Sequence, residues 1–203
     1  DRGGDWSSDV CSSDLFLSVP GYPRALAVLG NAFSHQSFKH LAINMVFMYI
    51  MGTQLHDQIG RGNFLALYFG TAVTGSFASL AFHVVTKRFN VSSLGASGAL
   101  NGVVAATLYL NWNNSMRLFG ILPPEPYSGP TGAWWLAGLI AYELWSLKRK
   151  NLHPSLYDNM AHLGGAFGGL AGVEAMKLRA RKRASERRRL MGSTSGGPAK
   201  RWW

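Results

Sequence analysis

The chain has 203 residues, of which 47% are hydrophobic and 15% charged, and its formal net charge is +10. A soluble domain usually carries about 25% charged residues, so this composition argues against an ordinary soluble domain. A single cysteine, Cys11, excludes an internal disulfide framework and a cysteine-based metal site.

The first residues differ from the rest of the chain. Residues 1–14 are polar and low in complexity, and they show no periodicity. We interpret them as a non-native segment of the kind that a translated adapter leaves, and exclude them from fold reasoning. The following residues, up to Lys39, carry turn signals at Pro20 and Pro23 and predict a loop with short amphipathic pieces.

Five apolar segments follow. The second is long enough to cross a bilayer, which takes about 20 residues. It contains no charged residue, whereas a soluble bundle shows charged stripes on its outer faces. We therefore predict an all-α, polytopic membrane helix bundle, in which some helices shield others from lipid, rather than a soluble bundle. The segments are residues 41–55, 64–85, 96–112, 133–147 and 160–176.

A basic run directly follows the fifth apolar segment. Residues 177–189, KLRARKRASERRR, supply most of the net charge. Such runs also bind nucleic acid, but a polybasic segment beside a membrane helix favours contact with anionic lipid headgroups. We therefore predict a membrane domain over residues 15–176 and a basic flexible tail over residues 177–203, with no nucleic-acid partner.

Three groups of polar residues lie at or near the ends of the apolar segments, where their burial in lipid is costly and marks functional candidates. Ser97, in the sequence G-x-S-G, is either a helix N-cap or a nucleophile. His40 and Asn44 are four residues apart and so share a helix face, where they either serve packing or donate hydrogen bonds in a site. His162 is followed by glycines whose spacing permits a tight helix crossing.

These groups together predict a nucleophilic site. A serine hydroxyl needs a base to become a nucleophile, and a neighbouring histidine is the usual one. His40, Asn44 and the Ser97 N–H can supply the donors that an oxyanion requires. No acidic residue is placed by the sequence to orient His162, although Asp158 lies one helical turn away, so we expect a Ser–His dyad rather than a triad.

The motifs resemble those of the rhomboid family of intramembrane serine proteases. The order and spacing of the motifs are jointly specific, whereas no single motif is. The resemblance covers residues 33–172, and the residues before the final histidine look closest to mitochondrial and fungal-type members. The motifs are F-S-H at 33–35, H-x-x-x-N at 40–44, G-x-S-G at 95–98 and A-H-x-G-G-x-x-x-G at 161–169.

This resemblance implies a role for each motif residue. Ser97 would attack the scissile carbonyl, and His162 would act as general base and then as general acid. His40, Asn44 and the Ser97 N–H would form the oxyanion hole. Family members often carry a tyrosine four residues after the serine, stacked on the histidine. This chain has Asn101 there, so His162 must be held differently or less firmly.

The resemblance also implies a six-helix bundle, in which Gly165 and Gly169 let the helix of His162 pack against that of Ser97. Five of these helices are visible, and the missing first one would fall at the non-native segment, so we expect an N-terminally truncated member. Its substrates would be single-pass membrane proteins. The protein itself would need no metal or organic cofactor. The expected location is the mitochondrial inner membrane, or otherwise a bacterial plasma membrane or another cellular membrane.

Two other functions remain open. One is a catalytically inactive rhomboid-like protein that binds client helices without cutting them, although such relatives usually lack the serine or the histidine. The other is a small channel or transporter subunit with Ser, Asn and His side chains along a polar pathway. The channel hypothesis predicts that Ser97 has no special reactivity.

Overall fold

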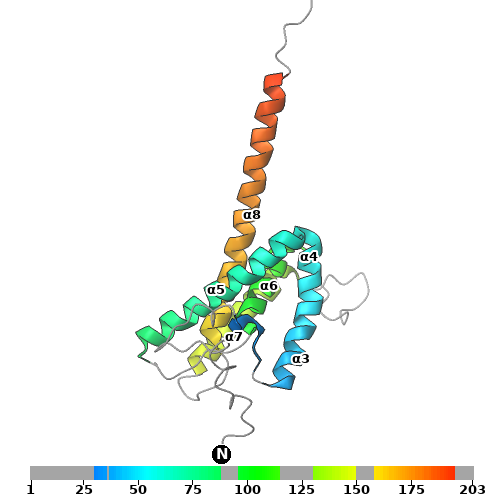
Figure 1. Ribbon diagram of the computed structural model, residues 1–203. Helices are drawn as coiled ribbons and strands as arrows, with labels where there is room; N and C mark the ends of the chain where they lie inside the picture. The colour runs from blue at the N-terminus through cyan, green and yellow to red at the C-terminus, as the bar shows by residue number, and fades with distance from the viewer. Residues whose placement is uncertain (1–29, 36, 88–95, 115–129, 150–157, 195–203) are drawn as a thin grey trace, which may run out of the picture.

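The computed structural model describes residues 30–35, 37–87, 96–114, 130–149 and 158–194, so the predicted non-native segment lies outside it. The prediction of an all-α fold is confirmed over the described residues (Figure 1). Each of the five predicted apolar segments corresponds to helix. The elements are η1 (Asn31–Phe33), α3 (Phe38–Phe47), η2 (Met48–Gly52), α4 (Thr53–Ile59), α5 (Arg61–Val85), α6 (Ser97–Leu110), α7 (Gly132–Arg149) and α8 (Asn159–Thr194).

The first predicted segment is a continuous helical run formed by α3, η2 and α4. Ser37 caps it, because its backbone is extended and its Oγ accepts a hydrogen bond from the His40 N–H at 3.2 Å. The middle part, Met48–Gly52, is a π-helix, a form that commonly occurs as a short insertion within α-helices. The run ends at Gly60, whose φ of 78° favours glycine, and the chain turns directly into α5.

Two of the described helices are strongly apolar. By length and composition, α5 is the one described helix that could cross a membrane, and α6 is a shorter apolar helix. Large apolar side chains also lie on the outside of the bundle, among them Phe77 on α5 (60% exposed) and Phe167 on α8 (72% exposed). Extensive exposed apolar surface of this kind marks an interaction with a membrane or another protein.

Helix α8 packs against both α5 and α6, and glycines permit its close approach (Figure 1). A Cβ atom at Gly165 would collide with the carbonyl oxygen of Gly98 on α6, and one at Gly169 with that of Gly102. Glycines on the adjoining face of α8 make similarly tight contacts with α5. Because the first turns of α6 and α8 lie at this crossing, it determines the distance between their side chains.

The basic segment differs from the predicted flexible tail. Helix α8 continues without interruption from the bundle to Thr194, well beyond the predicted boundary at residue 177 (Figure 1). Lysine, arginine, alanine, leucine and glutamate are all good helix formers, so the composition sustains the helix without tertiary contacts. An ion pair one turn apart, between Lys177 Nζ and Glu174 Oε1 at 2.8 Å, bridges the junction.

Candidate active site

Ser97 is the first residue of α6. The preceding residue, Ala96, occupies the N-cap position and forms no side-chain cap, so the Ser97 hydroxyl is not used as a helix cap. The Ala96 N–H donates to the carbonyl of Ser34 at 3.0 Å, which ties the start of α6 to the segment after η1. Gly95 of the G-x-S-G motif lies outside the described residues.

His162 lies in the first turn of α8, and Asp158 fixes that turn. The Oδ1 atom of Asp158 accepts from the Ala161 N–H at 3.0 Å, and its carbonyl accepts from the His162 N–H at 3.1 Å. The other carboxylate oxygen accepts from the hydroxyl of Ser79, a fully buried residue of α5. Asp158 therefore caps α8 and fastens it to α5, and its carboxylate is not the group that orients the imidazole.

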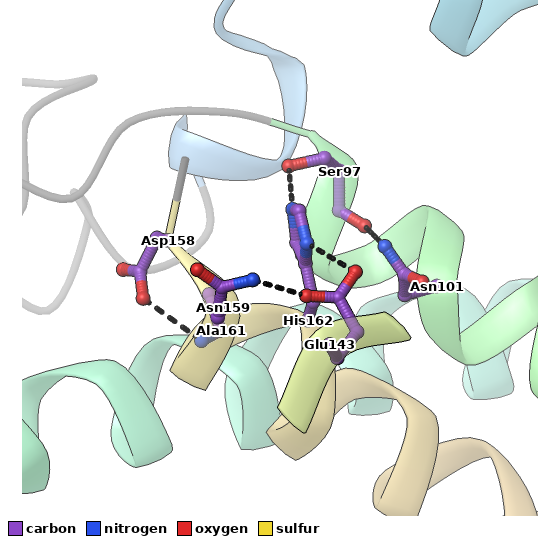
Figure 2. Close-up of polar contacts among 7 residues, drawn as sticks. All are labelled: Ser97, Asn101, Glu143, Asp158, Asn159, Ala161 and His162. Carbon is purple, nitrogen blue, oxygen red and sulfur yellow. Dashed lines mark hydrogen bonds and ion pairs between the residues drawn. The ribbon is translucent and has the colours of Figure 1, made fainter. Parts of the chain in front are cut away.

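The structure brings the predicted nucleophile and base together. The Nε2 atom of His162 lies 2.8 Å from the Oγ atom of Ser97 (Figure 2). His162 is 8% exposed, and Ser97 is partly buried. At this distance the imidazole can accept the hydroxyl proton, provided that its other nitrogen carries the ring proton.

Glu143 of α7 holds the other side of the imidazole, an acidic partner that was not expected from the sequence. Its Oε1 atom lies 2.9 Å from His162 Nδ1, and its Oε2 atom accepts from the Asn159 side-chain amide at 2.6 Å (Figure 2). Glu143 is only 4% exposed. Serine, histidine and glutamate therefore form one hydrogen-bonded chain, contributed by α6, α8 and α7.

Glu143 was not predicted as a site residue, although the sequence carries a signal for it. It is the only charged residue in the apolar segment 133–147, and a lone ionisable residue in such a segment is a functional candidate by default. What the sequence does not specify is the helix that packs beside His162. Asp158 was considered only because it is close along the chain.

The two predicted side-chain donors of the oxyanion hole, His40 and Asn44, lie on α3, which contacts α6. Asn44 is 4% exposed, and its Nδ2 atom finds no acceptor among the described residues. The ring of His40 lies 5.5 Å from that of His35, centroid to centroid. A buried amide donor that is not used within the fold is available to a ligand.

Asn101, which stands where family members often have tyrosine, contacts the serine rather than the histidine. Its side-chain amide donates to the Ser97 carbonyl at 3.0 Å, one helical turn back (Figure 2). The first turn of α6 thereby gains a second hydrogen bond at the position of the nucleophile. The imidazole is held instead by Glu143.

The part of the chain that the structure describes contains no cluster of metal-ligating side chains. Within those ranges, no three His, Cys, Asp or Glu side chains come together in a way that could hold a metal ion.

Comparisons with known proteins agree with the motifs. Residues 24–176 match the family model described as the Rhomboid domain. The Saccharomyces cerevisiae protein named Rhomboid protein 1, mitochondrial, is 37% identical over 146 residues, covering 71% of this chain and 40% of the yeast protein. The Danio rerio Presenilin-associated rhomboid-like protein A, mitochondrial, is 32% identical over 147 residues, covering 72% of this chain and 36% of the fish protein.

A bacterial relative also matches. The Bacillus subtilis protein named Rhomboid protease GluP is 28% identical over 144 residues, which cover 71% of this chain and 24% of that protein. The chain thus spans less than half the length of the curated relatives it matches here. The family model, by contrast, covers residues 24–176 and so includes every predicted site residue.

Proposed function

Because the chain belongs to the rhomboid family, we propose that it is an intramembrane serine endopeptidase with Ser97 as nucleophile and His162 as general base. The observation that carries this proposal is the 2.8 Å contact between the Ser97 hydroxyl and the His162 imidazole. The two side chains come from separate helices and meet in a mostly buried setting, where electrostatic interactions are stronger than in water.

In the acylation step, the Ser97 Oγ atom attacks the carbonyl carbon of the scissile peptide while its proton passes to His162 Nε2. The tetrahedral intermediate then collapses as the bond between carbon and nitrogen breaks. The imidazolium returns its proton to the leaving amine, which leaves an ester on Ser97. A water molecule repeats the sequence on the ester, with His162 again as base and then as acid.

Three donors support the proposed oxyanion hole. The Ser97 N–H is at the start of α6, where N–H groups have no intrahelical acceptor and the helix dipole favours negative charge. Asn44 contributes its buried amide, and His40 is the third predicted donor. Loss of one such donor typically costs about 10²–10³ in rate.

We expect the substrates to be single-pass transmembrane proteins in a mitochondrial membrane. The names of the yeast and fish relatives, both of which include the word mitochondrial, support this location. The exposed apolar side chains of α5 and α8 suit a lipid environment. Substrate helices would have to reach the Ser97 hydroxyl from that lipid.

We expect anionic lipid headgroups to contact the basic part of α8. Lys177 lies 15 residues beyond His162 on the same helix, so the basic segment leaves the bundle at the end opposite to the site. The side chains from Arg179 to Arg189 are exposed, and seven of these eleven residues are lysine or arginine. Basic residues next to a membrane helix gain about 1 kcal/mol each near an anionic surface.

The direct test is a cleavage assay in proteoliposomes that contain the 203-residue chain. Single-pass transmembrane segments with tagged ends serve as substrates, and mass spectrometry identifies the products. We expect internal cleavage that Ser97→Ala and His162→Ala abolish. Ser185→Ala, which removes an exposed hydroxyl from the basic part of α8, is the matched control and should cut normally.

The assay also separates the alternatives. A client-binding protein without activity would retain the segments, recovered by crosslinking, without cutting them. A channel or transporter subunit would pass ions or solutes through the proteoliposomes and would leave the segments intact. Either result from correctly folded protein would overturn the proposal.

A further inference from the structure

Glu143 is the charged residue in the bundle that the family mechanism leaves without a role. It lies in the apolar part of α7 and is 4% exposed. Burial of a carboxylate is costly unless it is paired and hydrogen-bonded. Both of its oxygens are occupied, one by the His162 imidazole and the other by the Asn159 amide.

The contacts of Glu143 fix how it meets the imidazole. Asn159 and His162 both lie in the first turn of α8, three residues apart and therefore on one face. Asn159 donates through its amide nitrogen, which leaves Glu143 as the acceptor in that contact. An acceptor carboxylate at 2.9 Å from Nδ1 places the ring proton on Nδ1 and leaves the Nε2 lone pair facing the Ser97 hydroxyl.

We propose that Glu143 is a positioning residue that sets the tautomer of His162 and stabilises the imidazolium formed when Ser97 attacks. The proposal rests on the protease function proposed above and adds a third member to its dyad. When His162 accepts the serine proton, the hydrogen bond between a neutral imidazole and the Glu143 carboxylate becomes an ion pair in a buried setting. The interaction is therefore stronger in the transition state than in the resting enzyme, which is the condition for raising the rate.

This role also accounts for Asn101. A tyrosine stacked on the histidine is not needed to orient a ring that a carboxylate already holds through Nδ1. Asn101 donates instead to the Ser97 carbonyl. The imidazole is thus fixed along its own plane by hydrogen bonds at both nitrogens.

The test measures inactivation of the full chain, in detergent, by a fluorophosphonate that reacts with activated serines. We expect Glu143→Gln, which keeps the shape and removes the charge, to lower kinact by about 10²–10⁴. The KI and the melting temperature should change little. Glu174→Gln is the matched control and should react like the wild type. Glu174 lies on α8, 12 residues beyond His162, and is hydrogen-bonded to Tyr109 and Lys177 instead.

The outcomes separate this role from the protease function. Folded wild-type protein that does not react would overturn the proposed function itself. A reactive wild type together with a Glu143→Gln variant of unchanged kinact would overturn only the positioning role. An equal loss of kinact in Glu174→Gln would overturn it too, because the effect would not be specific to the carboxylate beside His162.

A measurement on the wild-type chain keeps the proposal testable if Glu143→Gln does not fold. The ¹⁵N spectrum of histidine-labelled protein, with the His162 signals assigned by comparison with His162→Ala, reports which ring nitrogen carries the proton. We expect the proton on Nδ1 of the neutral ring. A ring protonated only on Nε2 would contradict the proposal.

Discussion

The Nε2 atom of His162 lies 2.8 Å from the Oγ atom of Ser97, across 65 positions of sequence. Each residue is in the first turn of its helix, so the distance depends on how closely α6 and α8 cross. The crossing in turn depends on glycines, because Gly165 and Gly169 lie against the carbonyls of α6. Helix packing and the proposed chemistry are therefore coupled.

The crossing predicts a specific loss of stability. A methyl group at Gly165 collides with backbone, which cannot move as a flexible side chain can, so Gly165→Ala should destabilise the fold by about 1–3 kcal/mol. Gly138→Ala on α7 is the control, because a Cβ atom there meets nothing within 4 Å. Equilibrium unfolding in mixed detergent compares the two. Equal stabilities would show that the close crossing is not required.

The oxyanion hole predicts a loss of rate without a loss of fold. Asn44→Ala removes a buried amide whose Nδ2 atom finds no acceptor among the described residues, so little stability should be lost. The cleavage rate should fall by about 10²–10³. The control is Asn63→Ala on α5, where an exposed amide donates to the Ile59 carbonyl. If Asn44→Ala instead melted well below the control and cut at the wild-type rate, its role would be structural.

Asn101 should matter much less to the rate than Glu143. Asn101→Ala removes one hydrogen bond to the Ser97 carbonyl, worth about 1 kcal/mol, which corresponds to less than about a tenfold change in rate. Fluorophosphonate inactivation of both variants, measured side by side, checks the ranking. A loss in Asn101→Ala as large as that in Glu143→Gln would mean that the histidine depends on Asn101 instead.

The basic part of α8 predicts a salt-sensitive effect of lipid. In nanodiscs, phosphatidylglycerol should raise the melting temperature relative to phosphatidylcholine, and 0.5 M salt should weaken the effect. A triple change to glutamine at Arg179, Arg181 and Lys182, nearest the bundle, should remove it. The matched triple change at Arg187, Arg188 and Arg189 should not, because these lie roughly a Debye length, about 10 Å, further out. The reverse ranking would contradict the predicted lipid contact.

Much of the fold could be predicted from hydrophobic patterning. The five apolar segments correspond to helices, and the start of α6 at Ser97 agrees with the small-residue run that precedes it. The continuation of α8 to Thr194 was not predicted, because a dense run of positive charge was interpreted as a flexible tail. Helix propensity, which that interpretation ignored, favours the helix.

The site was predicted in part. Ser97 and His162 were found because their motifs are local and in a recognisable order. Glu143 was missed because its contact with His162 depends on which face of α7 meets α8, and hydrophobic periodicity does not determine that. Its position as a lone acid in an apolar segment was the available signal.

The most direct test of the account is whether Ser97 is an activated nucleophile. The folded chain is treated with a fluorophosphonate, digested, and analysed by mass spectrometry for the modified residue. We predict a single adduct, on the Ser97 hydroxyl, that is lost in Ser97→Ala and strongly reduced in His162→Ala. An unmodified Ser97 in folded protein, or equal modification of exposed serines such as Ser185, would contradict the account.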